Sequence, residues 1–417
     1  MRVVLKFTPL FGVNFSGQSF LNQAIDCTIN SEKNLLRFAI FIYFCYEQIS
    51  TMKRDTNHIK AAILEAVDSR DSKAYNIILE CGIAALPILA EHLSKDLPIE
   101  MLERFESVLK AILRSNLNSV LPSETARQLA LFQKNLGFLL KYKSYAIKAS
   151  TPLGYSIFIQ NEREGFSYQR HVSHKTEVFH ILEVKRGGYV FICDFEDWIR
   201  YYDKDSFSAW LSGQSDDRYD QYRLEPNPGD VFVIDRLNVV HTVIGCVLEE
   251  FATVSTDMVD RLQDQNAGKP IPAYFNRHYA QERLRAISTP RTSRRIENRI
   301  GMHQVTEIVP IRISGGQVTP LARTSIISAS HYLIEPFQTS ELQIDEQRIA
   351  TIHIKEGAGR VIIADREEVK SFTPPTILIC AGDVLMIPAN TYYGFVNEDA
   401  HPLKVSEHKV PPEAALF

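Results

Sequence analysis

The sequence predicts a mainly β protein of the α+β class, in which a helical domain precedes two antiparallel β barrels. Apolar residues recur at three- and four-residue intervals between 57 and 149, as in packed helices. After Gly154 the pattern changes to short β-rich runs broken by Gly, Pro and Asp, and the same pattern returns between 319 and 410. A chain of 417 residues is also too long for one ordinary domain.

These patterns divide the chain into five parts. They are an N-terminal extension (1–52), a helical domain (53–149), a first barrel (150–260), a linker or tail (261–317) and a second barrel (318–417). The extension is either a small N-terminal element or sequence upstream of a true start at Met52. The helical domain carries no catalytic constellation, so we expect it to serve structure or to bind a protein partner.

Charge and cysteine usage restrict the class of protein. The formal net charge of −4 argues against a nucleic-acid-binding surface as the main function. The six cysteines are scattered without a CxxC pair, which is typical of reduced thiols in a cytosolic protein. The apolar stretch 35–46 is shorter than the roughly 20 residues that a membrane span requires. We therefore expect a cytoplasmic protein with no membrane partner.

Three residues in the first barrel have the chemistry of a metal site. Five residues lie between Gly165 and His171, five more lie between His171 and Glu177, and His241 follows the Gly229 turn farther along. Two or three imidazoles and one carboxylate bind a divalent metal tightly without filling its coordination shell. We predict a metal centre at these residues.

The strand periodicity leaves one ligand open. Residues alternate faces along a regular strand, so His171, Ser173, Lys175 and Glu177 would share one face. A turn or bulge would instead bring His174 inward, so both His171 and His174 are candidates. The odd offset of His180 from Glu177 points its side chain to the opposite face.

The glycine, histidine and glutamate spacing resembles the two signatures of the cupin barrel, a double-stranded β-helix or jelly roll. The second barrel repeats the closing signature and has lost the ligands, since Ala350 stands where Glu177 does and Tyr393 where His241 does. The residues that carry this second copy are Gly382, Pro388, Asn390, Tyr393 and Asn397. The resemblance covers about residues 150–417 and implies a bicupin with one metal site.

The stretch 249–269 loosely resembles the cupin domains of type II phosphomannose isomerase and mannose-1-phosphate guanylyltransferase. This resemblance implies a sugar or sugar-phosphate isomerase, in which a metal polarises the substrate carbonyl. Lys175 and Glu177 are then the candidate catalytic residues, and the more common role for a lysine such as Lys175 is that of a solvated strand residue. Arg236 and Arg261 could meet a phosphate or form surface ion pairs.

Two other functions stay open. Two imidazoles and a carboxylate also suit a non-haem Fe(II) dioxygenase or hydroxylase, and the sequence does not distinguish Zn, Mn, Ni and Fe. A non-catalytic sugar-binding or scaffold bicupin is the third hypothesis. The aromatic insertion at 196–227 favours a lid or a subunit contact. We also expect a homodimer, since cupin barrels commonly pair through their edge strands.

Overall fold

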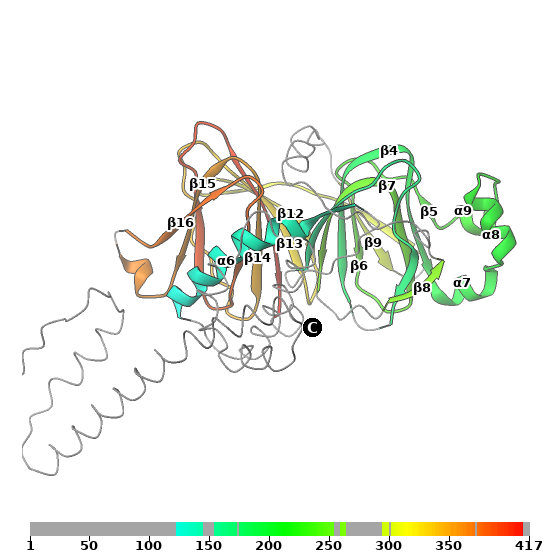
Figure 1. The fold of residues 1–417 in the computed structure, drawn as a ribbon, viewed down its shortest axis with the longest axis horizontal. Helices are drawn as coiled ribbons and strands as arrows, with labels where there is room; N and C mark the ends of the chain where they lie inside the picture. The colour runs from blue at the N-terminus through cyan, green and yellow to red at the C-terminus, as the bar shows by residue number, and fades with distance from the viewer. Residues whose placement is uncertain are drawn as a thin grey trace, which may run out of the picture. The chain divides into compact units, whose positions relative to one another are not determined.

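The computed structural model describes residues 122–144, 154–172, 175–253, 259–263, 294–299, 302–371 and 373–411 (Figure 1). The N-terminal extension and the predicted helical domain up to residue 121 lie outside these residues. The described chain is mainly β, as the sequence predicts. Within it, no helix is long and apolar enough to cross a membrane.

The first barrel is built on two long antiparallel strands, β4 and β7. Its main sheet has the order β1-β2-β7-β4-β6-β9-β10, in which β9 is Arg294–Arg299 and β10 is Met302–Glu307. Strand β3 joins β7 to β8, and β5 pairs with β4. The strands are β1 (Tyr142–Ser144), β2 (Tyr155–Ile159), β3 (Tyr168–His171), β4 (Glu177–Asp194), β5 (Arg223–Leu224), β6 (Val231–Ile234), β7 (Val239–Ala252) and β8 (Val259–Gln263). The core includes Phe158, Phe179 and Leu248, whose burial contributes about 1.5–3 kcal/mol each.

The second barrel consists of a six-stranded and a three-stranded sheet, ordered β11-β12-β13-β19-β14-β17 and β16-β15-β18. Its elements are β11 (Ile311–Ile313), β12 (Gly316–Arg323), β13 (Ser328–Ile334), β14 (Ile349–Glu356), β15 (Ala358–Ala364), η2 (Glu368–Lys370), β16 (Thr376–Cys380), β17 (Val384–Ile387), β18 (Tyr392–Val396) and β19 (Leu403–Val410). Isoleucine, leucine and valine side chains fill the space between these sheets.

One glycine turn occurs in both barrels, as the repeated signature predicts. Gly229 has a φ of 98° before β6, and its N–H donates to the carbonyl of Ile181 at 2.6 Å. Gly382 has a φ of 90° before β17, and its N–H donates to the carbonyl of Ile354 at 2.7 Å. Glycine adopts this left-handed conformation at no steric cost. The two barrels therefore share this turn and its hydrogen bonds.

The segment expected to be a linker, 261–317, contributes strands where it is described. Strands β9 (Arg294–Arg299) and β10 (Met302–Glu307) form a hairpin, and β9 pairs with β6 in parallel. The Arg294 guanidinium donates to both oxygens of Asp230 at 2.9 Å. This arginine lies in a basic run with no strand-like period, so only the tertiary pairing reveals the strand.

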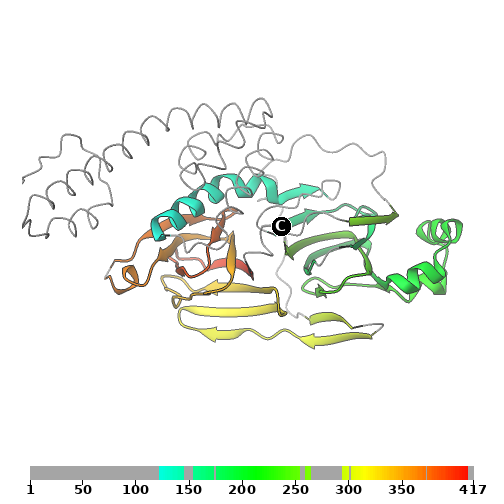
Figure 2. The same cartoon turned by 90° about the horizontal axis from the view of Figure 1, so that it is seen from below.

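The helix predicted after Pro122 is α6 (Ser123–Lys141). Ala126 and Ala130 on this helix are fully buried in the core of the second barrel. The Lys134 ammonium lies 3.3 Å from the carboxylate of Asp383, beside the turn before β17. Figure 2 shows α6 beside the strands of this barrel.

The aromatic insertion folds into three short helices, α7 (Phe195–Tyr201), α8 (Lys204–Leu211) and α9 (Asp217–Asp220). Trp198, Phe207 and Trp210 are buried in one cluster with Tyr168 and Phe191 of the barrel strands. The Phe207 and Tyr168 rings pack edge to face with centroids 4.9 Å apart, a favoured geometry for aromatic pairs. Much of the aromatic surface of the insertion is therefore buried against strands of the same chain.

Candidate metal centre

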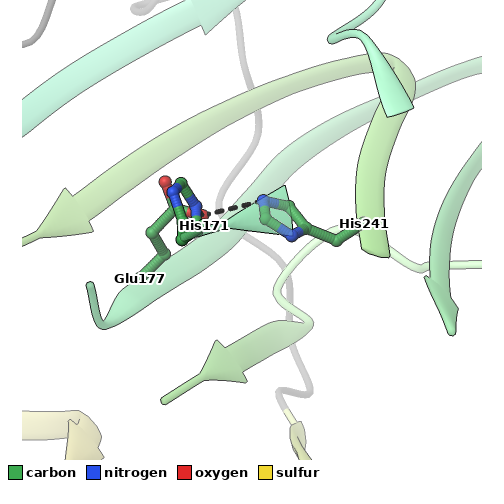
Figure 3. A group of neighbouring side chains, drawn as sticks. All are labelled: His171, Glu177 and His241. Atoms are coloured by element: carbon green, nitrogen blue, oxygen red, sulfur yellow. Dashed lines mark ion pairs between the residues drawn. The ribbon is translucent and has the colours of Figure 1, made fainter. Parts of the chain in front are cut away.

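The structure brings His171, Glu177 and His241 together inside the first barrel (Figure 3). His171 ends β3, Glu177 begins β4, and His241 lies in β7. The Nε2 atoms of His171 and His241 are each 3.0 Å from Oε2 of Glu177. All three side chains are buried, with exposed fractions of 3%, 2% and 0%.

A close approach of backbones sets this geometry. Gly165 forms an isolated antiparallel bridge with Ile244 of β7, and four residues farther along the chain Gln169 pairs with His241. A Cβ atom at Gly165 would lie 2.2 Å from the carbonyl oxygen of Val243. Only glycine lets the chain approach β7 this closely, and this approach places β3 beside His241.

The three facing atoms lack hydrogen-bond partners. His171 Nε2, Glu177 Oε2 and His241 Nε2 are buried and accept or donate no hydrogen bond. The Nδ1 of His241 lies 3.1 Å from the carbonyl oxygen of Val239 and must donate to it, because a carbonyl only accepts. The tautomer with its hydrogen on Nδ1 carries its lone pair on Nε2, toward Glu177. Converging lone pairs are unfavourable unless a cation lies between them.

The protonation states suit a metal. Burial lowers the pKa of His171 to about 4, so this imidazole is neutral near pH 7. Burial favours the protonated form of Glu177, but the nearby Lys175 ammonium and His171 outweigh it and hold the carboxyl pKa well below its usual range. A neutral imidazole and an ionised carboxylate are the forms that coordinate divalent metals. The donor set therefore fits a metal ion.

The corresponding position in the second barrel is closed by protein side chains. Ala350 lies opposite Ile387 as Glu177 lies opposite Ile234, so the register supports the predicted equivalence. The Tyr393 hydroxyl donates to Oε2 of Glu407 at 2.6 Å. Further contacts to this carboxylate come from Tyr332 at 3.1 Å, Gln343 at 3.0 Å and Lys409 at 3.3 Å. Partners thus occupy both oxygens of Glu407.

Comparison with known proteins gives structural similarity only. No family model and no curated protein sequence matches the chain. Solved structures similar in fold include mannose 6-phosphate isomerase from Bacillus subtilis, at 13% identity and a TM-score of 0.40, covering 61% of this chain and 74% of that one. Another is Bacillus subtilis oxalate decarboxylase with Mn(II) centres, at 14% identity and a TM-score of 0.37, covering 60% and 67%.

AerE from Microcystis aeruginosa is also similar, at 9% identity and a TM-score of 0.34, covering 61% of this chain and 85% of that one. The chain resembles cupin enzymes in its fold. With identities of 14% or less, these similarities concern the fold alone, and any chemistry of this chain has to be argued from its own site.

The other predicted site residues have different surroundings. Lys175 is buried and bonds to Oε1 of Glu177, with Glu250 at 3.4 Å, so it is not a solvated strand lysine. Arg236 is partly buried in the turn between β6 and β7, and Arg261 is exposed on β8. Ser173 and the alternative ligand His174 lie outside the described residues.

A second histidine and glutamate cluster was missed by the sequence reasoning. His180, Glu249 and His331 have ligand-type atoms within 4.8 Å of one another. The alternation along β4 correctly places His180 away from the metal-type cluster, by which we mean His171, Glu177 and His241. Its partners come from β7 and from β13 of the second barrel, so no local sequence pattern connects them.

Proposed function

We propose that this protein is a metal-dependent cupin enzyme that acts on a small polar metabolite. His171, Glu177 and His241 of the first barrel would hold one divalent ion. The observation that carries the proposal is the convergence of three buried donor atoms without hydrogen-bond partners. Residues at a purely structural polar cluster would satisfy one another, as those around Glu407 do.

The ligand set leaves coordination positions for a substrate. Lys175 binds Oε1 of Glu177, so the carboxylate presents only Oε2 to the ion. Three protein ligands leave at least one open position, even in a four-coordinate centre. A bound divalent ion would polarise a substrate carbonyl and acidify the adjacent C–H. The substrate class we propose is a sugar or sugar phosphate with neighbouring carbonyl and hydroxyl groups, and the reaction is its isomerisation.

Lys175 lies beside the ligands and carries a positive charge. Its ammonium group is only 5% exposed and lies between Glu177 and Glu250. In that position it would stabilise negative charge that develops on a substrate oxygen during proton transfer. We propose this electrostatic role for Lys175, with Glu177 acting through the metal.

A second candidate is a non-haem Fe(II) oxygenase. The described ligands are two imidazoles and one carboxylate, which is the set that such iron enzymes use on one face of the metal. This observation favours oxygen chemistry as the alternative to isomerisation.

The first experiment is metal analysis of protein purified without a metal-affinity tag. We expect close to one divalent ion per chain by mass spectrometry, and a loss of at least about 100-fold in metal affinity for Glu177→Gln and His241→Gln. Glu407→Gln is the matched control, because Glu407 is also a buried carboxylate but has its partners within the second barrel. It should retain the metal.

Activity assays then separate the two reaction classes. Interconversion of aldose and ketose phosphates without oxygen consumption supports the isomerase. Oxygen consumption with Fe(II) supports the oxygenase instead. Wild-type protein that binds no metal even after reloading with Zn²⁺, Mn²⁺, Ni²⁺ and Fe²⁺ would refute the enzyme proposal and leave a binding or scaffold protein.

A further inference from the structure

The second cluster lies where the two barrels meet, around the buried carboxylate of Glu249. Its Oε2 atom is 2.8 Å from Nδ1 of His180 and 3.0 Å from Nε2 of His331. The ammonium of Lys355 donates to the same oxygen at 3.1 Å. His180 and Glu249 belong to the first barrel, whereas His331 and Lys355 belong to the second. One carboxylate oxygen thus joins groups from both barrels.

The other oxygen of Glu249 is also shared between the barrels. Oε1 accepts from the hydroxyl of Tyr155 on β2 at 2.8 Å and from the hydroxyl of Ser406 on β19 at 2.8 Å. The Tyr155 hydroxyl lies 2.5 Å from Nδ1 of His353 on β14. The carboxylate side chain is 0% exposed. Its contacts therefore form a hydrogen-bonded network across the barrel contact.

This cluster does not have the chemistry of the metal-type cluster. There, the facing atoms of His171, Glu177 and His241 lack partners. Around Glu249, Nδ1 of His180 and Nε2 of His331 both contact the carboxylate, and both carboxylate oxygens have partners. The Lys355 ammonium contacts the oxygen that a metal would use. A lysine ammonium supplies the single positive charge that balances a buried carboxylate. A divalent ion would have to displace it.

We propose that the Glu249 cluster is a buried lock that couples the two barrels into one cooperative unit, with Lys355 as its cation. Removing one partner from a buried, fully bonded carboxylate leaves an unsatisfied charge on one side of the contact. The lock therefore favours the state in which the barrels stay together. This proposal is independent of metal binding by the first barrel.

The lock also depends on protonation. Burial lowers the pKa of His180 and lowers that of His331 to about 3, with Lys355 adding to both effects, so the cluster holds one positive charge near neutral pH. Acid would force a second charge into it. The ionisable and polar groups around Glu249 come from β2, β4, β13, β14 and β19, and Asp230 also acts on His180. The groups around Glu249 on these strands are Tyr155, His180, His331, His353, Lys355, Ser406 and His408.

The test is urea unfolding of the full chain with a separate readout for each barrel. The two tryptophans, Trp198 and Trp210, both pack on the first barrel, so their fluorescence reports its unfolding. Pulsed hydrogen exchange of peptides from β13 to β19 reports the second barrel. We expect the two readouts to coincide in the wild type and to separate in Glu249→Gln. Glu407→Gln is the matched control: it should lower the midpoint while the readouts stay together.

A wild type in which the two readouts do not coincide, or a Glu249→Gln variant in which they still do, would overturn the proposal. If Glu249→Gln does not fold, a double-mutant cycle between His180→Gln and Lys355→Met, which lie on different barrels, gives the same information. We expect the combined effect to depart from the product of the single effects by about fivefold or more in the unfolding equilibrium constant. Additive effects, or a metal ion lost specifically in His331→Gln, would contradict the lock.

Discussion

At the scale of single residues, three buried glutamates have three different surroundings. Glu177 has one oxygen bonded to Lys175 and one oxygen without a hydrogen-bond partner. Glu249 has partners from both barrels, and Glu407 has partners within the second barrel. Residue type and burial are the same in each case. The partners decide whether the carboxylate is suited to bind a metal, to join two barrels or to fill a barrel interior.

Replacing Lys175 by Met should destabilise the metal-free protein by about 3–5 kcal/mol, because Glu177 would remain as a buried carboxylate without its cation. A divalent ion would supply the missing positive charge. Urea unfolding with a chelator and then with Mn²⁺ or Zn²⁺ should therefore show a larger gain in stability on metal addition for Lys175→Met than for wild type.

The control is Lys404→Met, which removes an ion pair at 2.7 Å between half-buried Lys404 and exposed Glu356. This substitution should lower the free energy of unfolding by no more than about 1 kcal/mol, with or without metal. Equal losses in the two variants would show that Lys175 contributes no more than a surface lysine.

At the scale of elements, the helices α7 to α9 behave as part of the first barrel. Figure 1 shows them grouped beside β5 and β8, outside the strands of that barrel. Phe207 is 1% exposed and its ring contacts Tyr168, Trp198, Trp210 and Tyr219. The tryptophans on which the expectation of a lid or a subunit contact rests, Trp198 and Trp210, are buried against residues of β3, β4 and β7.

Phe207→Ala should cost about 3–5 kcal/mol of unfolding free energy, because it removes a buried aromatic ring and leaves a cavity. Ile199→Ala on the neighbouring helix is the comparison, since Ile199 is 63% exposed and should change stability by less than about 0.5 kcal/mol. Chemical denaturation measures both. Similar small effects would indicate that the insertion is only loosely attached to the barrel.

At the scale of the whole molecule, the contact between barrels should weaken in acid. The pKa of His331 is lowered from 6.5 to about 3 by burial, Lys355 adding to the effect, so the unfolded chain binds a proton that the folded chain excludes. The stability from the neutral imidazole is fully present above about pH 6.5 and is lost as the pH falls toward 3.

Unfolding free energy measured between pH 6.5 and pH 4 should therefore fall more steeply for wild type than for His331→Gln. The difference in slope can reach about 1.4 kcal/mol per pH unit for one proton. His401→Gln is the control, because His401 is 80% exposed. If the curves of wild type and His331→Gln run parallel, His331 does not take part in the acid response.

Local pattern was enough to predict much of this architecture. The change of period after Gly154 predicted the barrels. The repeated closing signature placed Tyr393 where His241 stands in the first barrel, and the alignment of the strand ends placed Ala350 where Glu177 stands. Strand alternation also separated His180 from His171 and Glu177. These predictions succeed because side-chain direction along a strand and the conformation of a glycine turn depend on neighbouring residues.

The sequence alone therefore predicts the mainly β class, the two barrels and the candidate ligands Glu177 and His241, and it leaves His171 and His174 open as alternatives for the remaining imidazole. The folded chain was needed to show that His171 lies beside Glu177 and that Lys175 is buried against the same carboxylate. It was also needed to show that Arg294 lies in a strand beside β6 and that Glu249 meets His331 and Lys355. The physical reason is that a partner across a barrel or between barrels is chosen by strand pairing and packing over long sequence separations. Periodicity specifies the face of a strand, but not the residue that this face meets.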